Sequence, residues 1–307
     1  MFELFLAPMV MASALRLTAP VLFVATGGAL GHKARVLNIG LESFMAFSAF
    51  FAMYGSFLFE SAPVGLLFGV LSSMFASCIF ALFVLHFRSN PVVVGIALNL
   101  SGWGATTFLL DALLEKRGVF IDARIKSFAQ INIPVIEDIP YIGEIVSGQN
   151  ILVYFSIVVV AAAYVFLYKT SFGLRLRGVG IKKVAAQTVG VNAVLYQWAA
   201  ILAGGVLSGF GGAFLTIGGA SMFTEGISAG KGFLALAAIM VGDGHPVKTA
   251  LACLVFGYTQ AISVTLQSVG LPSQIVISVP YLITVLIMLV SASAGKYRFK
   301  RAGGSAD

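Results

Sequence analysis

Charged residues are scarce in this sequence. Of its 307 residues, only 10% are Asp, Glu, Lys or Arg, whereas 59% are hydrophobic and the mean hydropathy is +0.99. Soluble domains usually contain about 25% charged residues, so this composition argues against a water-soluble enzyme, a nucleic-acid-binding protein and a disordered chain. The sequence therefore predicts an integral membrane protein.

Cysteine and histidine are also rare. The two cysteines, Cys78 and Cys253, lie inside apolar runs, where neither a disulfide framework nor a zinc site is expected. The three histidines, His32, His86 and His245, fall at predicted cytoplasmic ends of membrane helices. Because the spans contain no cluster of metal ligands and no paired carboxylates, we predict neither a metal site nor catalytic residues.

A phosphate-binding loop for ATP is missing as well. Such a loop has the form GxxxxGK followed by Ser or Thr. Gly230-Lys231 lacks the upstream glycine, and Gly295-Lys296 is followed by Tyr297. We therefore predict that the chain is not an enzyme and carries no cofactor of its own, so that any ATP-driven activity would need a partner.

Long uncharged runs predict an all-α, polytopic fold, because one crossing needs about 20 mostly apolar residues. These runs are 4–31, broken by Arg16 and Pro20, and then 37–59, 61–85, 89–110, 145–168, 184–224 and 249–295, which Pro272 divides. The stretch 233–241 is too short to span alone, and its flanking glycines predict a broken or re-entrant helix near 232–242. We expect one transmembrane domain, residues 1–307, with about eight to ten crossings.

The distribution of basic residues predicts the orientation. A loop at 169–192 and the C-terminal tail are basic and nearly free of acids, which places both in the cytoplasm. Residues 32–35, Arg88 and Lys248 fall on the same side, whereas Lys231 and the loop 114–148 fall outside. Membrane topology thus accounts for the net charge of +7 without a nucleic-acid partner. We expect no cleavable signal peptide, because a basic n-region and a cleavage site are not evident.

Few polar residues lie within the spans. Glu42 is the clearest ionisable one, and either backbone amides or Arg35 could satisfy its carboxylate. Asn99, Trp103 and Ser208 are candidates to line a solute path, although hydrogen bonding between helices would explain them equally well. The glycines clustered between 204 and 212 favour close helix packing.

The loop 169–192 contains an amphipathic pattern from Ile181 to Val189. It predicts one short helix between Gly180 and Gly190, with Asn192 capping the following span. Such a helix could lie on the lipid surface or dock into a groove on a soluble partner.

Several motifs resemble those of ABC importer permeases of the ribose, branched-chain amino acid and nucleoside group. The loop around Gly180 is similar to the coupling loop LRAxGxNxxAAxxxGI, with Lys182 where Asn is common. The segment Leu37-Asn38-Ile39-Gly40-Leu41-Glu42 looks like VNIGLEG of the nucleoside and simple-sugar branch, with Ser43 in place of the final Gly. Weaker matches are 15–20, 95–99, 230–233, 242–246 and 256–257.

This resemblance implies a transmembrane subunit of an importer in the bacterial cytoplasmic (inner) membrane, for a nucleoside or a similar polar solute such as a simple sugar or riboflavin. A separate ATPase would bind ATP and Mg, and a second homologous permease and an extracytoplasmic substrate-binding protein would complete it; a heterodimer is favoured and a homodimer remains possible. The residues implied in ATPase coupling are Arg175, Gly180, Lys183, Ala185, Ala186 and Gly190, and those of the family motif are Asn38, Gly40 and Glu42. The alternative is an ion-coupled carrier that acts without an ATPase and uses Glu42.

Overall fold

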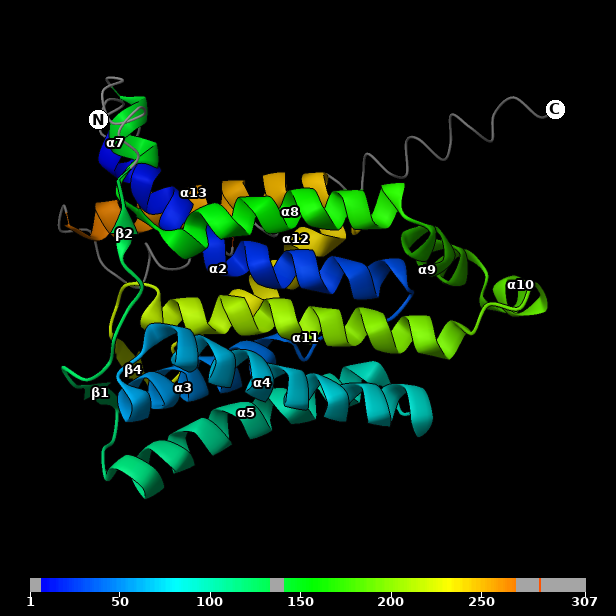
Figure 1. Ribbon diagram of the computed structural model, residues 1–307, viewed down its shortest axis with the longest axis horizontal. Helices are drawn as coiled ribbons and strands as arrows, with labels where there is room; N and C mark the ends of the chain where they lie inside the picture. Colours follow the sequence, from blue (N-terminus) through cyan, green and yellow to red (C-terminus); the bar gives the residue numbers. More distant parts are fainter. Residues whose placement is uncertain (1–6, 133–140, 269–281, 283–307) are drawn as a thin grey trace.

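Long helices that run side by side make up most of the molecule (Figure 1). The computed structural model describes residues 7–132, 141–268 and 282. In these residues seven helices are long and apolar enough to cross a membrane. They are α2 (Pro8–Lys33), α3 (Leu41–Phe59), α4 (Ala62–Ala81) with its π-helical extension η1 (Leu82–His86), α5 (Pro91–Leu114), α8 (Ile151–Lys169), α11 (Ala193–Ile217) and α13 (Pro246–Ser268). The predicted all-α membrane fold is confirmed, while the crossing expected after Pro272 lies outside the described residues.

Short elements occupy the two ends of the bundle (Figure 1). At one end β1 (Val119–Ile121) pairs with β4 (Met222–Thr224), and β2 (Gln130–Ile131) pairs with β3 (Gln149–Asn150), beside α7 (Ile142–Val146). At the other end α9 (Ser171–Ile181) and α10 (Lys183–Thr188) follow α8. Hence the described parts of the loop 114–148 and the loop 169–192 lie at opposite ends.

The predicted break at Arg16 and Pro20 is wrong, because α2 is continuous from Pro8 to Lys33. Proline has no amide proton, and its ring removes one hydrogen bond from a helix interior. Tertiary packing tolerates this loss here. Pro20 is buried, and Gly211 of α11 lies close to its carbonyl oxygen.

Close packing through the glycines of α11 is confirmed. A Cβ on Gly204 would lie 3.2 Å from the carbonyl oxygen of Gly27 in α2, and one on Gly209 would lie 2.7 Å from the Cα of Val70 in α4. On the other side, Gly212 packs against the carbonyl oxygen of Met45 in α3. Small residues thus place α11 at the centre of the bundle, in contact with α2, α3 and α4.

The basic residues expected in the cytoplasm gather at the end formed by α9 and α10. His32, Lys33 and Arg177 line one cavity there, and Arg35, Arg88 and Lys183 line a neighbouring one. Lys231 departs from the expectation. It was placed in an outer loop, but it is the first residue of a short helix that starts inside the bundle, α12 (Lys231–Val241).

Candidate functional site

The family motif forms a non-helical segment that enters the bundle. The run 37–59 was expected to be helical throughout, but residues 34–40 are turns and irregular chain, and α3 begins only at Leu41. Gly102 of α5 lies against Ser43, about 16 Å along α5 from its cytoplasmic end at Pro91. Since the hydrocarbon core is about 30 Å thick, the motif reaches roughly the middle of the membrane.

Irregular backbone at this depth needs partners from the protein, because no water replaces the missing hydrogen bonds. The amide group of Asn99 supplies two of them. Its Nδ2 donates to the carbonyl oxygen of Ile39 over 3.0 Å, and its Oδ1 accepts the amide proton of Ser43 over 3.0 Å. Asn38 Oδ1 accepts the amide proton of Gly40. Asn99 is 3% exposed, so its place in the structure is that of an interhelical hydrogen-bonding group.

Two glycines let α5 approach the motif. A Cβ on Gly95 would lie 2.9 Å from the backbone nitrogen of Gly40, and one on Gly40 would lie 3.6 Å from the Cα of Gly95. Any larger side chain at Gly95 would therefore push α5 away from residues 39 and 40. The motif 95–99 and the motif 37–42, which are separate in sequence, form one packed unit.

The carboxylate of Glu42 holds the inner end of α12. Its Oε1 accepts the amide proton of Gly230 over 2.9 Å, and its Oε2 accepts that of Gly232 over 2.7 Å. Glu42 is fully buried. The first amides of a helix lack intrahelical partners, and a negative charge there also interacts favourably with the helix dipole. Of the two alternatives for Glu42, the structure shows the backbone amides as its partners, while Arg35 is exposed and makes no such bond.

The predicted broken helix is also confirmed. Its chain leaves β4, passes through turns at 225–230 and becomes helical only beside Glu42. Helix α12 then ends near the cytoplasmic end of α2, where Asp243 pairs with Lys33 over 3.2 Å and with His32 over 3.4 Å. Desolvation opposes ionisation of Asp243, but Lys33 and His32 outweigh it and hold the pKa of this carboxyl below its ordinary value. Acidic side chains thus secure both ends of α12.

The loop 169–192 contains two helices where one was expected. The short helix predicted between Ile181 and Val189 is present as α10, which runs from Lys183 to Thr188. Gly180 does not delimit it, because a further helix, α9, runs through Gly180 and ends at Ile181. The extended backbone of Lys182 separates the two helices. The predicted cap is confirmed, because Asn192 Oδ1 accepts the amide proton of Leu195 over 3.2 Å.

This loop is linked to the residues that precede the motif. Gly180 packs against the carbonyl oxygen of Lys33, and a Cβ at this position would overlap that oxygen. Lys183 Nζ donates to Gln197 Oε1 over 3.2 Å, and Gln197 Nε2 donates to the carbonyl oxygen of Ala34 over 3.2 Å. A movement of α9 or α10 would therefore act on residues 33 and 34, which lead into the motif.

The remaining residues of the expected coupling set lie elsewhere in the same loop. Arg175 Nη1 donates to the Tyr196 hydroxyl over 3.4 Å. Ala186 is buried, while Ala185 is exposed. Gly190 has a φ of +82°, and a Cβ there would meet no atom of the described residues within 4 Å beyond its chain neighbours.

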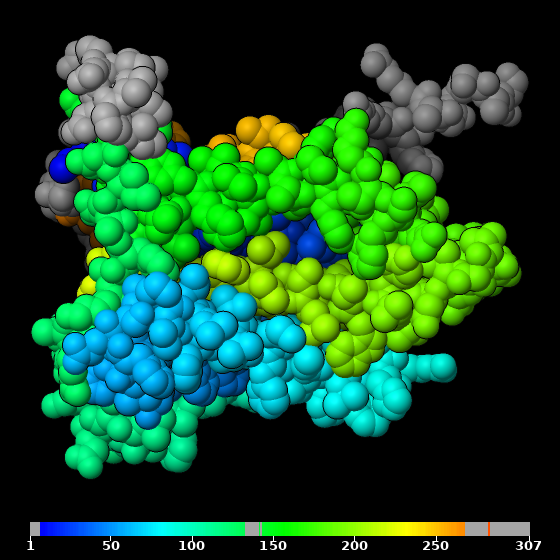
Figure 2. All heavy atoms as spheres, viewed as in Figure 1, coloured from blue at the N-terminus to red at the C-terminus, as the bar shows by residue number. Residues whose placement is uncertain are grey.

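Large apolar side chains are exposed at the tip of the loop. Ile181 is 87% exposed, Val184 68% and Val189 77%. The space-filling view shows this loop as a protrusion beyond the end of the bundle (Figure 2). A helix lying flat on the membrane surface would not project in this way, so the geometry favours docking to a partner.

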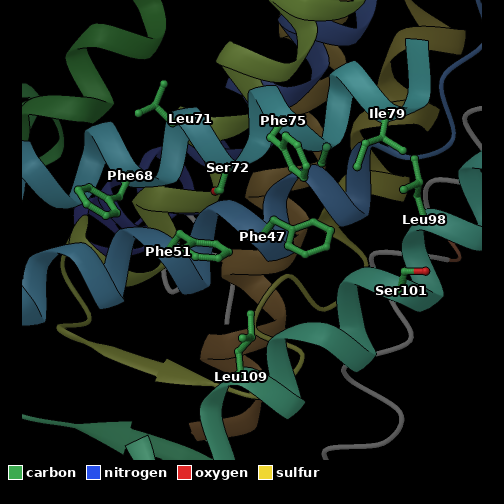
Figure 3. A pocket seen from close by; sticks show the side chains of 11 residues that line it. Phe47, Phe51, Phe68, Leu71, Ser72, Phe75, Ile79, Leu98, Ser101 and Leu109 are labelled. Carbon is green, nitrogen blue, oxygen red and sulfur yellow. The ribbon is translucent and has the colours of Figure 1, made fainter. Parts of the chain in front are cut away.

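The other two candidates for a solute path lie in different surroundings. Ser208 is fully buried in α11, and its hydroxyl has no hydrogen-bond partner among the described residues. Trp103 is 40% exposed on α5. It does not line the apolar groove of about 620 Å³ between α3, α4 and α5, to which α5 contributes Leu98, Ser101 and Leu109 (Figure 3). Together with Asn99, they do not form one cluster in the structure.

Sequence reasoning missed Gln197 and both glycines that bind Glu42. Gln197 is a polar residue in an apolar run and could have been noticed for that reason. The pair Gly230 and Gly232 stood at the start of the predicted broken helix. The link from Gly232 to Glu42 spans 190 positions, and no local pattern encodes such a contact.

The similarity of this chain to known proteins extends over most of its length. Residues 10–292 match the family described as branched-chain amino acid transport system / permease component. The nucleoside ABC transporter permease protein NupC of Lactococcus lactis is 32% identical, over 91% of this chain and 90% of its own. The guanosine ABC transporter permease protein NupQ of Bacillus subtilis is 32% identical, over 88% of each chain.

A putative glucose ABC transporter permease of Haloferax volcanii is 25% identical, over 82% of this chain and 75% of its own. No solved structure is significantly similar to this chain. The family match and the two relatives at 32% identity identify the chain as a multi-pass transport component of the cytoplasmic membrane. The chain therefore belongs to the branched-chain amino acid transport system permease family.

Proposed function

We propose that this chain is the membrane-spanning subunit of an ATP-driven importer of nucleosides and that a separate ATPase subunit binds the tip of the loop 169–192. The two relatives at 32% identity are a nucleoside permease and a guanosine permease by name. The observation that carries the proposal is the junction of Gly180 and Gln197 with residues 33 and 34. This junction links the protruding loop to the residues that lead into the motif 37–42.

The coupling would work through packed backbone. ATP and Mg bind to the partner subunit, and closure of that subunit displaces α9 and α10. Gly180 and Gln197 pass the displacement to residues 33–40, and Glu42 passes it to α12. Rigid helices and buried hydrogen bonds transmit small shifts over such distances because packed interiors deform little.

A second permease subunit is part of the proposal. Helix α5 is the least buried of the seven long helices. Its exposed residues include small and polar ones, Ala97, Ser101, Gly104 and Thr107. Small residues favour contact with another helix over contact with lipid, so we place a homologous permease against α5. A substrate-binding protein would deliver the nucleoside to the opposite end, which contains β1 and β4.

The direct test removes the apolar tip. The double variant Ile181→Asp, Val184→Asp should insert normally but fail to retain the ATPase when the tagged permease is purified from its own membrane. Val119→Asp, an exposed apolar position at the other end of the molecule, is the matched control and should retain it. Normal retention by the double variant, or nucleoside uptake that an ion gradient drives without ATP, would contradict the proposal.

A further inference from the structure

A cavity of about 250 Å³ lies at the end of the molecule opposite α9 and α10. Gln130 of β2 and Asn150 of β3 line its outer part, and Lys231 lines it at the start of α12. Residues of α2 and α11 complete the wall, among them Arg16 and Pro20. The cavity, called here the outer pocket, thus connects the surface strands with the inner end of the broken helix.

The outer pocket is rich in hydrogen-bond donors. Arg16 and Lys231 both line it, and none of the described lining residues is acidic. Neither cation forms an ion pair within 4.0 Å with a described residue. Lys231 interacts electrostatically with Glu42, but both oxygens of that carboxylate already accept backbone protons. The side chain of Asn150, unlike the two cations, already has partners in the protein. Its Nδ2 donates to the carbonyl oxygen of Phe128, and its Oδ1 accepts the amide proton of Leu152.

Both cations can be reached by a solute that enters from outside, because Arg16 is exposed, Lys231 is half-buried and both line the pocket. For Lys231, burial without an ion-pair partner among the described residues is costly. A donor-rich pocket with no acid among its described lining residues suits a neutral or anionic solute with several acceptors, and its two cations repel other cations. Its position on the way to α12 places it on the route that an imported solute would take.

We propose that Arg16 and Lys231 bind the acceptor edge of the solute in the outer pocket, and that for nucleosides this edge is that of a 6-oxopurine. This inference rests on the proposed function and names the part of the solute that is recognised. A guanidinium presents two parallel N–H groups in a fixed fork. Guanine and hypoxanthine offer O6 and N7 as adjacent acceptors, whereas adenine offers N7 beside an amino donor. The ammonium group of Lys231 adds a positive charge but no pair of parallel N–H groups.

The experiment measures guanosine and adenosine uptake by the complete complex with its binding protein in proteoliposomes. The ratio of variant to wild-type uptake is taken for each solute, so that the selectivity of the unchanged binding protein cancels. Arg16→Gln should lower guanosine uptake at least about fivefold more than adenosine uptake, the lower bound for one bidentate pair. Arg16→Lys keeps the charge but not the fork and should show the same imbalance. Lys231→Gln should lower the uptake of both.

Two controls and three contrary outcomes test the inference. ATP hydrolysis stimulated by the binding protein should persist in the variants, and Lys116→Gln, an exposed lysine at the same end that does not line the pocket, should transport normally. Equal losses for both nucleosides in Arg16→Gln, or no loss in either Gln variant, would overturn the assignment. So would faster uptake of guanosine monophosphate than of guanosine, since the pocket would then bind a phosphate. A wild-type complex that takes up no nucleoside would instead contradict the proposed function.

Discussion

Glu42 Oε2 accepts the backbone amide proton of Gly232 over 2.7 Å, across 190 positions of sequence. This contact joins the family motif to the start of the broken helix α12. A Cβ on Gly232 would lie 2.6 Å from the Cα of Glu42, so the close approach also requires glycine at this position. The two segments therefore act as one structural unit at the middle of the membrane.

Replacing Glu42 by Gln should loosen this unit. The neutral amide offers one acceptor oxygen for two amide protons, and we expect a loss of about 2 kcal/mol in the free energy of unfolding. The melting temperature of the purified complex and its nucleoside uptake should both fall. Glu60→Gln, at the exposed far end of α3, is the control and should change neither. A normal melting temperature for Glu42→Gln would show that the clamp contributes nothing to stability.

Adding a methyl group at Gly180 should separate α9 from α2. A Cβ there overlaps the Lys33 carbonyl oxygen, and the backbone must shift at a cost of about 1–3 kcal/mol. Gly180→Ala should therefore lower the number of nucleosides transported per ATP hydrolysed. Its effect on assembly of the complex should be smaller. Gly178→Ala lies on the same helix and meets nothing within 4 Å, so it should behave as wild type. Identical behaviour of the two variants would contradict the packing of Gly180 against Lys33.

Gly190 allows partner contact to be separated from backbone strain. Its φ of +82° makes any other residue unfavourable, by about 1–2 kcal/mol. Gly190→Ala and Gly190→Trp share that strain, but the indole also fills the open space beside the loop. We expect normal membrane insertion for both and loss of uptake and of ATPase retention for Trp alone. If Gly190→Ala loses uptake and ATPase retention as fully as Gly190→Trp, backbone strain and not the partner contact explains the loss.

Gln197 should be needed for coupling. Leucine at this buried position leaves the Ala34 carbonyl oxygen without its donor and Lys183 without its acceptor, and one unsatisfied buried group costs about 1–3 kcal/mol. The complex with Gln197→Leu should still hydrolyse ATP but transport fewer nucleosides per ATP. Gln187 lines the same cavity, and its side chain has no hydrogen-bond partner among the described residues. Gln187→Leu should keep the wild-type ratio.

The sequence predicted the positions of the two cations in the outer pocket, Arg16 and Lys231, unequally well. Arg16 stood out because it interrupts an apolar run and falls in the motif 15–20. The sequence placed Lys231 in an outer loop. The apolar stretch that follows it is too short to span the membrane, so the sequence did not show how deep in the membrane this stretch begins. The hydrogen bonds from its neighbours Gly230 and Gly232 to Glu42 place the backbone of Lys231 within the bundle.

Composition and local pattern determined the class of this protein. Apolar runs fixed where most membrane helices lie, because a span must satisfy its own backbone hydrogen bonds and the bilayer sets its length. The basic residues fixed which end gathers the cytoplasmic loops, and short motifs indicated the family. Flanking glycines marked the two ends of the broken helix.

The tertiary structure decided how these parts meet. The non-helical segment 34–40 is stable inside the bundle only because Asn99 and Gln197 supply its hydrogen bonds from distant helices. Likewise, α2 continues through Pro20 because α11 packs against it. Such contacts depend on side chains far apart in sequence, and their free energy appears only when the helices have assembled. That is why the sequence could name Glu42 but not its partners.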